Sequence, residues 1–269
     1  MTQRPAVRIT DASLRFGERS LWSRLTLAVR PGEFVAVLGP NGSGKTSLLR
    51  VLLGQQRLGG GTAEVDGGAA AVGYVPQQGA SEAGAAAAVR GVDLVGLGLD
   101  GGRWGLGLRG MKERRRRVAA AVAAVDGQEF AGKPFGQLSG GEQQRLRVAQ
   151  ALVGEPSLLL CDEPLLSLDL AHQQAVSGLI DRRRREADTA VLFVTHELNP
   201  ILSYVDRVVY LVDGRFRIGK PHEVMTSEVL SDLYRTQVRV VRLDGQIHVA
   251  GLHSAVCEDE PHHIHSAAG

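Results

Sequence analysis

The sequence predicts an α/β fold with a parallel sheet at its core and an antiparallel β layer at the N-terminus. Short apolar runs at 34–38, 158–161 and 190–194 alternate with helical patterns, and such alternation implies parallel strands covered by helices. Residues 7–29 read instead as two strands around a tight turn. A chain of 269 residues, 43% of them hydrophobic, is long enough to bury a core of this kind.

The individual elements follow from local patterns along the chain. Apolar stretches bounded by turn residues predict strands at 7–16, 21–29, 34–38, 62–65, 72–75, 158–161, 190–194, 206–212, 215–218, 238–243 and 246–250. Helices are predicted at 47–53, 85–95, 112–125, 142–153 and 170–186. Glycines between 98 and 107 are expected to interrupt the chain after the helix at 85–95. Asp-Gly dipeptides divide the last four strands into two pairs that resemble hairpins.

Composition and charge exclude several classes of protein. Lys and Arg total 31 against 29 Asp and Glu, and this balance gives no basic excess that would favour nucleic acid as a partner. The arginine runs at 112–117 and 182–185 lie in predicted helices and are expected to be solvated faces. No apolar stretch follows Arg4 or reaches the ~20 residues of a membrane span, so the chain is expected to be neither secreted nor membrane-spanning. Two cysteines, Cys161 and Cys257, suit a reducing compartment, with Cys161 a small core residue.

A glycine-rich loop follows the strand at 34–38 and precedes a helix. It matches G-x-x-x-x-G-K-[ST], whose backbone N–H groups wrap the phosphates of a nucleoside triphosphate. Lys45 offers a positive charge to the β and γ phosphates, and the Thr46 hydroxyl can bind Mg²⁺. A chance match is the alternative, but both flanks are those that the motif requires. The predicted phosphate-binding residues are Gly39, Pro40, Asn41, Gly42, Ser43, Gly44, Lys45, Thr46 and Ser47.

Two adjacent carboxylates, Asp162 and Glu163, end the apolar run at 158–161. In open parallel sheets, ligands bind at the carboxyl ends of the strands. Neighbouring strand residues point to opposite faces, so we expect Asp162 to orient Mg²⁺ and Glu163 to polarise the attacking water. A charged pair that merely ends a buried strand is the alternative. Mg²⁺ requires a carboxylate near the phosphate loop, and this requirement favours the functional interpretation.

A helix N-terminus is predicted at the segment LSGGEQQR, residues 138–145. Ser139 and Glu142 form the S-x-x-E pattern of a capping box, and Gly140 and Gly141 expose backbone N–H groups that can bind an anion. A well-capped helix without a ligand is the alternative. In this order behind a phosphate loop, the segment resembles the signature sequence of the ATP-binding cassette (ABC) family.

Other motifs follow in the order of the same family, and the resemblance covers about residues 7–219. Residues 73–77 resemble its glutamine loop, 167–169 its D-loop, and Thr195-His196 its switch histidine. The resemblance implies that Gln77 contacts Mg²⁺ and water, that Asp169 contacts a second subunit, and that His196 senses the γ-phosphate.

An aromatic residue at the end of the first strand occupies the position of the adenine-stacking aromatic of that family. Phe16 stands there in place of the usual tyrosine, and stacking needs only the π face of the ring. A phenylalanine of the core is the alternative.

The resemblance also implies an assembly. In the ABC family the signature helix completes the ATP site of the opposite subunit, so the active form is expected to be a dimer, most simply a homodimer, that uses ATP and Mg²⁺. Residues 1–236 are expected to form the cassette, with a helical subdomain at about 80–155, followed by a hairpin at 237–250 and a flexible tail at 251–269. The expected further partners are an integral membrane permease and, indirectly, an extracytoplasmic solute-binding protein. This places the chain in the cytoplasm, peripheral on the inner face of the membrane.

The tail is rich in potential ligands for zinc and related metals. Three acidic residues, Glu258, Asp259 and Glu260, lie among the candidate metal ligands His253, Cys257, His262, His263 and His265. No fixed ligand spacing is present, and a solvated polar tail is the alternative. The cassettes of zinc and manganese importers often end in histidine-rich tails, and residues 91–110 loosely resemble that branch.

Together these features predict the ATPase subunit of an ABC importer for zinc or manganese. An importer of iron chelates, cobalamin or another solute remains an alternative. So does a soluble ABC protein of translation or DNA repair, although no paired cassette or coiled-coil insertion is visible. A module that binds nucleotide without hydrolysing it is disfavoured by the presence of Glu163 and His196.

Overall fold

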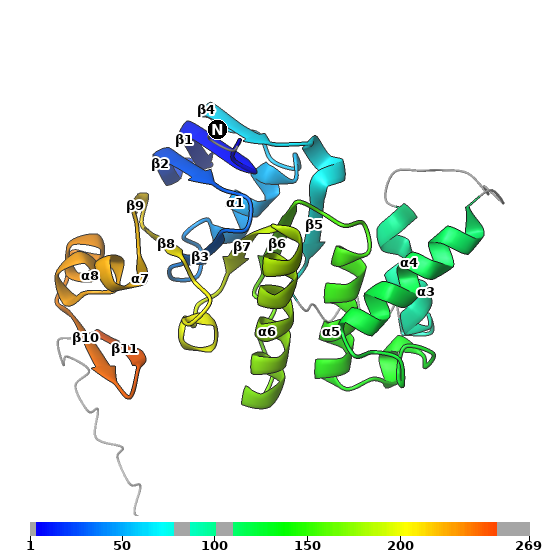
Figure 1. The fold of residues 1–269 in the computed structure, drawn as a ribbon. Helices are drawn as coiled ribbons and strands as arrows, with labels where there is room; N and C mark the ends of the chain where they lie inside the picture. Colours follow the sequence, from blue (N-terminus) through cyan, green and yellow to red (C-terminus); the bar gives the residue numbers. More distant parts are fainter. Residues whose placement is uncertain (1–3, 78–86, 101–109, 252–269) are drawn as a thin grey trace, which may run out of the picture.

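The computed structural model describes residues 4–77, 87–100 and 110–251. In this part of the chain the central sheet has six strands in the order β5-β6-β7-β3-β8-β9 (Figure 1). Neighbouring strands are parallel except β9, which runs antiparallel to β8. The strands are β3 (Phe34–Leu38), β5 (Val72–Val75), β6 (Leu158–Asp162), β7 (Ala190–Val194), β8 (Arg207–Val212) and β9 (Arg215–Gly219).

An antiparallel layer covers one face of this sheet, as predicted. Its strands are β1 (Val7–Phe16), β2 (Arg19–Val29) and β4 (Gly60–Val65), in the order β2-β1-β4 among the described residues. Helix α1 (Lys45–Leu52) shares a core with this layer and with Val35 and Val37 of β3. The alternating residues Phe34 and Ala36 belong to a second core on the opposite face, because successive side chains of a strand point to opposite sides.

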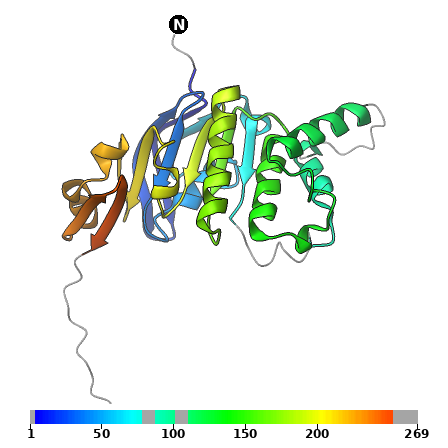
Figure 2. The same ribbon diagram turned by 60° about the horizontal axis from the view of Figure 1, so that its bottom comes forward.

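Helices cover the opposite face. Helix α6 (Leu170–Ala187) runs in front of the sheet in Figures 1 and 2, and α5 (Gly140–Leu152) lies beside it. Residues of both helices pack in the second core, where Phe34 and Phe193 stack with ring centroids 5.5 Å apart. The prediction that Cys161 is a core residue is confirmed, since its side chain is fully buried there, and burial raises the pKa of its thiol.

One side of the molecule consists of α3 (Gly91–Asp100), α4 (Met111–Ala124) and α5 (Figure 1). The predicted helix at 85–95 was wrong in its bounds: residues 87–90 are not helical, and α3 continues through Gly98. Close packing explains the difference. A Cβ atom on Gly98 would lie 2.1 Å from the Gln150 carbonyl oxygen, and one on Gly91 would lie 2.4 Å from Leu146 Cδ1. Gly98, which was expected to interrupt the chain, therefore lets α3 approach α5 closely, as Gly91 does. The other glycines of that expectation, between 101 and 107, lie outside the described residues.

The C-terminal elements form the other end of the molecule (Figure 1). They are α7 (Pro221–Val224), α8 (Ser227–Tyr234), β10 (Val238–Leu243) and β11 (Gln246–Gly251). The Tyr234 hydroxyl lies 3.0 Å from that of Tyr210 in β8, and burial raises the pKa of Tyr210. The Asn199 side chain makes two hydrogen bonds to the backbone of β11. Its Nδ2 donates to the Ile247 carbonyl at 3.0 Å, and the Ile247 N–H donates to its Oδ1 at 2.8 Å. The C-terminal hairpin is thus fastened to the body of the molecule through β11.

Three short 3₁₀ helices complete the described parts of the chain: η1 (Gly68–Ala71), η2 (Phe135–Gln137) and η3 (Asn199–Ile201). Both predicted Asp-Gly hairpins are confirmed, because Asp213, Gly214, Asp244 and Gly245 all have positive φ. Among the helices that the structure describes, none is long and apolar enough to span a membrane.

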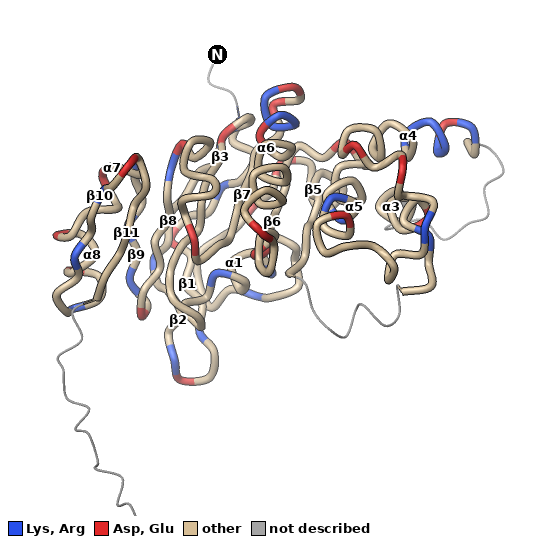
Figure 3. Tube along the Cα trace, turned by 90° about the horizontal axis from the view of Figure 1, so that it is seen from below, with Lys and Arg blue, Asp and Glu red and all other residues tan. Residues whose placement is uncertain are grey.

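The arginine runs behave differently from each other. On α4 the basic residues lie in the first half of the helix (Figure 3). Arg116 pairs there with Glu113 at 2.7 Å, and both side chains are exposed. On α6 the expectation of a solvated face was wrong for Arg184, whose side chain is only 12% exposed. Its guanidinium pairs at 2.8 Å with Asp181 and with Asp206, the residue that accepts the Phe34 N–H. Arg184 therefore joins α6 to the start of β3 and β8.

Candidate active site

The phosphate loop, residues 39–46, leaves the carboxyl end of β3 at the centre of the sheet and leads into α1. Three of its glycines have positive φ, namely Gly39 (141°), Gly42 (76°) and Gly44 (94°). A Cβ atom on Gly39 would lie 2.1 Å from the Leu211 carbonyl oxygen, and one on Gly44 would lie 2.9 Å from Trp22 Nε1. The loop is therefore held between β8 and β2, and only glycine fits these two positions.

Two polar groups of the loop are positioned to receive an anion. Lys45 Nζ donates to the carbonyl oxygens of Gly39 (2.8 Å) and Pro40 (3.1 Å), so its ammonium folds back across the loop. Burial lowers the pKa of Lys45, while the nearby carboxylates Glu163 and Asp162 raise it. The hydroxyl oxygen of Ser43 is buried and has no hydrogen-bond partner among the described residues. A phosphate would satisfy this hydroxyl and the loop N–H groups at once.

A set of oxygen ligands suited to Mg²⁺ lies beside the loop. Thr46 Oγ1 donates to Asp162 Oδ1 at 3.1 Å, so the hydroxyl and the carboxylate are adjacent. Burial raises the pKa of Asp162, and a bound cation would favour the ionised carboxylate. Gln77 follows β5, whose carboxyl end lies next to that of β6, and its side chain is exposed. Hydroxyl, carboxylate and amide oxygens are the donors that Mg²⁺ prefers, so these residues fit the ion.

A carboxylate and an imidazole face each other at the ends of β6 and β7. Glu163 Oε2 and His196 Nδ1 are 2.5 Å apart, and an ionised carboxylate can only accept, so Nδ1 carries the proton. Glu163 was expected to point to the face opposite Asp162, as neighbouring strand residues do, but it lies just beyond β6 with a φ of 49°. Its N–H donates to the Val194 carbonyl at 3.0 Å, and this bond fixes the turn that directs the carboxylate toward His196.

Phe16 lies at the end of β1 and is 75% exposed. This exposure contradicts the alternative that Phe16 belongs to the core. An exposed ring on the antiparallel layer remains available for stacking on a base.

The signature segment begins α5, and the predicted capping box is confirmed. The Glu142 N–H donates to Ser139 Oγ at 3.3 Å, and the Ser139 N–H donates to Glu142 Oε2 at 2.8 Å. The backbone hydrogen bond from Ser139 lowers the pKa of Glu142. Behind these two residues, Gly140 faces Leu168 and Gly141 lies directly against the ring of His172.

Asp169 is the N-cap of α6. Its Oδ1 accepts hydrogen bonds from the backbone N–H of His172 (2.8 Å) and from the ring Nδ1 of His172 (2.7 Å). Both hydrogen bonds lower the pKa of Asp169, and the backbone hydrogen bond has the larger effect. The sequence analysis did not include His172, although its position three residues after an N-cap aspartate was a visible signal.

The predicted site residues therefore form two groups in the described chain. Lys45, Thr46, Asp162, Glu163 and His196 surround the phosphate loop, and Ser139 to Glu142 lie with Asp169 at the helix N-termini of α5 and α6. The metal-ligand candidates of the tail, His253, Cys257, His262, His263 and His265, lie outside the described residues. Within the described ranges, no cluster of His, Cys, Asp and Glu side chains is arranged to hold a metal ion.

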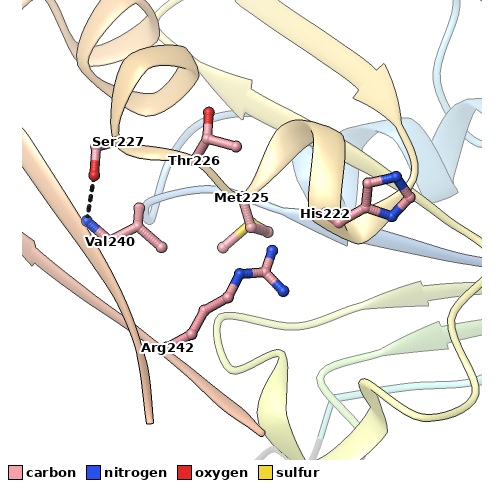
Figure 4. A pocket seen from close by; sticks show the side chains of 6 residues that line it. All are labelled: His222, Met225, Thr226, Ser227, Val240 and Arg242. Carbon is pink, nitrogen blue, oxygen red and sulfur yellow. Dashed lines mark hydrogen bonds between the residues drawn. The ribbon is translucent and has the colours of Figure 1, made fainter.

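A separate hollow lies among the C-terminal elements (Figure 4). Across it the Val240 N–H donates to Ser227 Oγ at 2.9 Å, and this bond holds β10 against the start of α8. None of the predicted nucleotide ligands is among its lining residues, which are His222, Met225, Thr226, Ser227, Val240 and Arg242. The hollow is therefore not the site of the predicted chemistry.

Known proteins resemble this chain over most of its length. The zinc import ATP-binding protein ZnuC of Roseobacter denitrificans is 37% identical over 231 residues, which are 86% of this chain and 84% of that protein. The hemin import ATP-binding protein HmuV of Rhizobium johnstonii is 35% identical over 271 residues, which are 93% and 98% of the two chains. The aliphatic sulfonates import ATP-binding protein SsuB of Ralstonia nicotianae is 35% identical over 216 residues, which are 79% and 72%.

Solved structures give the same result for the fold. A metal-chelate type ABC transporter in an inward-facing conformation superimposes with a TM-score of 0.79 at 26% identity, covering 93% of this chain and 99% of that one. A dimeric ATP-binding cassette bound to ADP and Pi superimposes with a TM-score of 0.66 at 26% identity, covering 80% and 98%. The sequence pattern of the ABC transporter family matches residues 22–166. The chain therefore belongs to the ABC transporter family and is an ATPase.

Proposed function

We propose that this chain is the ATP-hydrolysing subunit of an importer whose cargo is zinc. The observation that carries the ATPase chemistry is the placement of Glu163 and His196 beside Thr46, Asp162 and the phosphate loop. Two observations support zinc as cargo: the similarity to a zinc import ATP-binding protein, and the histidines and cysteine of residues 253–265. The similarity to the hemin import protein, which spans more of both chains, favours hemin as the second candidate.

Each residue near the phosphate loop has a role that its geometry permits. Lys45 Nζ exchanges its carbonyl partners for phosphate oxygens, and Ser43 Oγ donates to a phosphate. Thr46, Asp162 and Gln77 would hold Mg²⁺, which would supply positive charge that offsets the charge of the phosphates. Glu163 Oε2 accepts a proton from the attacking water, and His196 Nδ1–H orients that carboxylate. Phe16 stacks on the adenine.

The second group of site residues acts on a second copy in this proposal. The N-terminus of α5, with Ser139, Gly140 and Gly141, carries exposed N–H groups that close over the nucleotide of the partner. Asp169 contacts the partner next to it. ATP favours the closed pair, and loss of the γ-phosphate releases it, because the nucleotide binds the two states with different affinity.

The cassette transmits this cycle to a membrane permease. In the proposal, residues 1–236 form the cassette, 237–250 a hairpin and 251–269 a tail, and the cassette dimer lies peripherally on the inner face of the membrane. A solute-binding protein delivers the cargo from the other side.

The cargo is tested in vesicles that contain the permease, this chain and the solute-binding protein. We expect Zn²⁺-loaded binding protein to stimulate ATP hydrolysis and uptake, with Mn²⁺, hemin and an aliphatic sulfonate as competitors. Stimulation by hemin instead of Zn²⁺ would transfer the proposal to the second candidate. Lys45→Ala is the control for the ATPase itself: it should lose nucleotide binding, and unchanged binding would refute the assignment of the phosphate loop.

The tail is tested by deletion after Gly251. Metal sensitivity of transport should change, whereas ATP turnover of the isolated chain should remain that of the parent. A matched variant with His253, His262, His263 and His265 replaced by Asn keeps the length of the tail. If transport of neither variant differs from the parent at any Zn²⁺ concentration, the tail is a solvated polar segment and no metal ligand.

A further inference from the structure

A side chain of α6 links the two segments that face the partner subunit in the proposed dimer. We define the signature turn as residues 138–142 and the D segment as residues 167–169. His172 lies one turn into α6 and touches both: its ring nitrogen Nδ1 is 2.7 Å from Asp169 Oδ1, and its ring lies against Gly141.

The ring of His172 is fixed in orientation by its contacts. The Asp169 carboxylate accepts from Nδ1, so Nδ1 carries a proton. The same carboxylate already caps α6 through the backbone N–H of His172 at 2.8 Å. Helix capping requires only that backbone bond, so the ring bond serves to orient the imidazole.

The orientation brings the ring onto the backbone of the signature turn. A Cβ atom on Gly141 would lie 2.0 Å from His172 Cδ2 and 2.6 Å from both Cγ and Nε2. Real Cβ atoms do not approach ring atoms so closely, so the ring occupies the space where any other residue would carry its side chain. A Cβ atom on the neighbouring Gly140 would lie 3.9 Å from Leu168 Cδ2, so the D segment also lies close to the signature turn at this residue.

The surrounding surface fits a face that is covered in an assembly. Leu170, next to Asp169 at the start of α6, is 66% exposed, and the ring of His172 itself is partly exposed. Both side chains are therefore accessible to a second copy of the chain.

We propose that His172 is a positioning residue that locks the signature turn to the D segment of the same chain, so that both segments engage the partner as one rigid unit. This inference rests on the proposed function, because it assigns a task to the face that closes on the second nucleotide. A loose turn would have to be ordered at each closure, and the ordering would lower the population of the closed, hydrolysing state.

The first test compares three variants of the full chain. His172→Ala removes both ring contacts. His172→Asn keeps an N–H donor for Asp169 but has no atoms that reach Gly141. Gln174→Ala, an exposed position on the same helix, is the matched control. Steady-state hydrolysis is measured against ATP and against protein concentration, and nucleotide affinity is measured with a fluorescent ATP analogue.

We expect kcat to fall about tenfold in both His172 variants, with KM and nucleotide affinity changed less than about twofold. The protein concentration at half-maximal rate should rise, and Gln174→Ala should behave as the parent. Parental kcat in His172→Asn, which keeps the cap and the fold, would overturn the proposal even if His172→Ala unfolds.

The second test asks whether the ring and Gly141 act on each other. In the parent, Gly141→Ala should lower the melting temperature, because its methyl group meets the ring of His172. In the His172→Ala background, the same substitution should change the melting temperature little. Equal losses in the two backgrounds would overturn the inference. If Lys45→Ala still binds nucleotide, the proposed function fails; if only these His172 tests fail, the ATPase assignment stands.

Discussion

Thr46 Oγ1 donates a hydrogen bond to Asp162 Oδ1 at 3.1 Å, which joins the first turn of α1 to the end of β6 across 116 residues of sequence. The bond gives the carboxylate one partner in a buried position. It also sets the spacing of two oxygen ligands before any cation binds. The remaining cost of burial is visible in the raised pKa of Asp162.

Asp162→Asn should stabilise the nucleotide-free protein at neutral pH while it lowers Mg²⁺-dependent hydrolysis. A carboxyl whose pKa is raised on folding is favourable below its unfolded pKa, and this contribution is lost as pH rises through the folded pKa. The amide of Asp162→Asn does not ionise and avoids that loss. We therefore expect the free energy of unfolding to rise by on the order of 1 kcal/mol at about pH 7.5 and to be unchanged at about pH 3. Urea unfolding at both pH values measures it.

The exposed Asp244→Asn is the control, since its left-handed conformation suits asparagine equally well. A destabilised Asp162→Asn at neutral pH would show that the carboxylate is not penalised by burial.

Glu163→Gln should bind ATP, keep the dimer closed and turn over at least about a hundredfold more slowly, because the amide cannot accept the proton of water. Phosphate release and size exclusion with ATP measure the two effects. Glu197→Gln is the matched control, since Glu197 adjoins His196 on the exposed side. Parental turnover in Glu163→Gln would remove this residue as the base.

Gly98→Ala should destabilise the protein by about 1–3 kcal/mol, because its methyl group would meet the Gln150 carbonyl oxygen. Intrinsic helix propensity predicts the opposite effect, a stabilisation of up to about 1 kcal/mol, because alanine favours helix over glycine. Denaturant unfolding distinguishes these outcomes. A Cβ atom on Gly132 would have none of the described heavy atoms within 4 Å, so Gly132→Ala is the control for the added methyl group.

Asn199→Ala should loosen the C-terminal hairpin from η3, because both hydrogen bonds to Ile247 are lost. We expect a loss of about 1–2 kcal/mol and faster hydrogen exchange at the Ile247 amide. The exposed Gln246→Ala in the same strand is the comparison. Unchanged exchange at Ile247 would mean that the Asn199 bonds do not hold the strand.

Local pattern was sufficient for much of this structure. The buried parallel strands and the Asp-Gly hairpins follow from residue type alone, and the capping box of Ser139 and Glu142 depends on a spacing of three residues. The phosphate loop was predictable because its strand and helix adjoin it in sequence.

Contacts between distant segments were not predictable in this way. Gly98 was predicted to interrupt the chain because nothing in residues 91–100 reveals that α5 will approach it. Arg184 was misassigned because its partner Asp206 belongs to a later element. His172 was missed because its significance depends on Gly141, which lies on another helix.

The two hydrogen bonds between Asn199 and Ile247 affect how readily the protein aggregates in concentrated solution. A two-stranded ribbon leaves both outer edges open, and an open edge can recruit strands from other molecules. On β10 the outward N–H groups of Val238 and Val240 are bonded to Ser231 and Ser227, and on β11 the Asn199 amide occupies the edge at Ile247. Val241 and Leu243 are exposed on the ribbon, so an open edge beside them would favour aggregation. Ser227, Ser231 and Asn199 occupy groups of the two edges and thereby protect the protein from pairing with strands of other molecules.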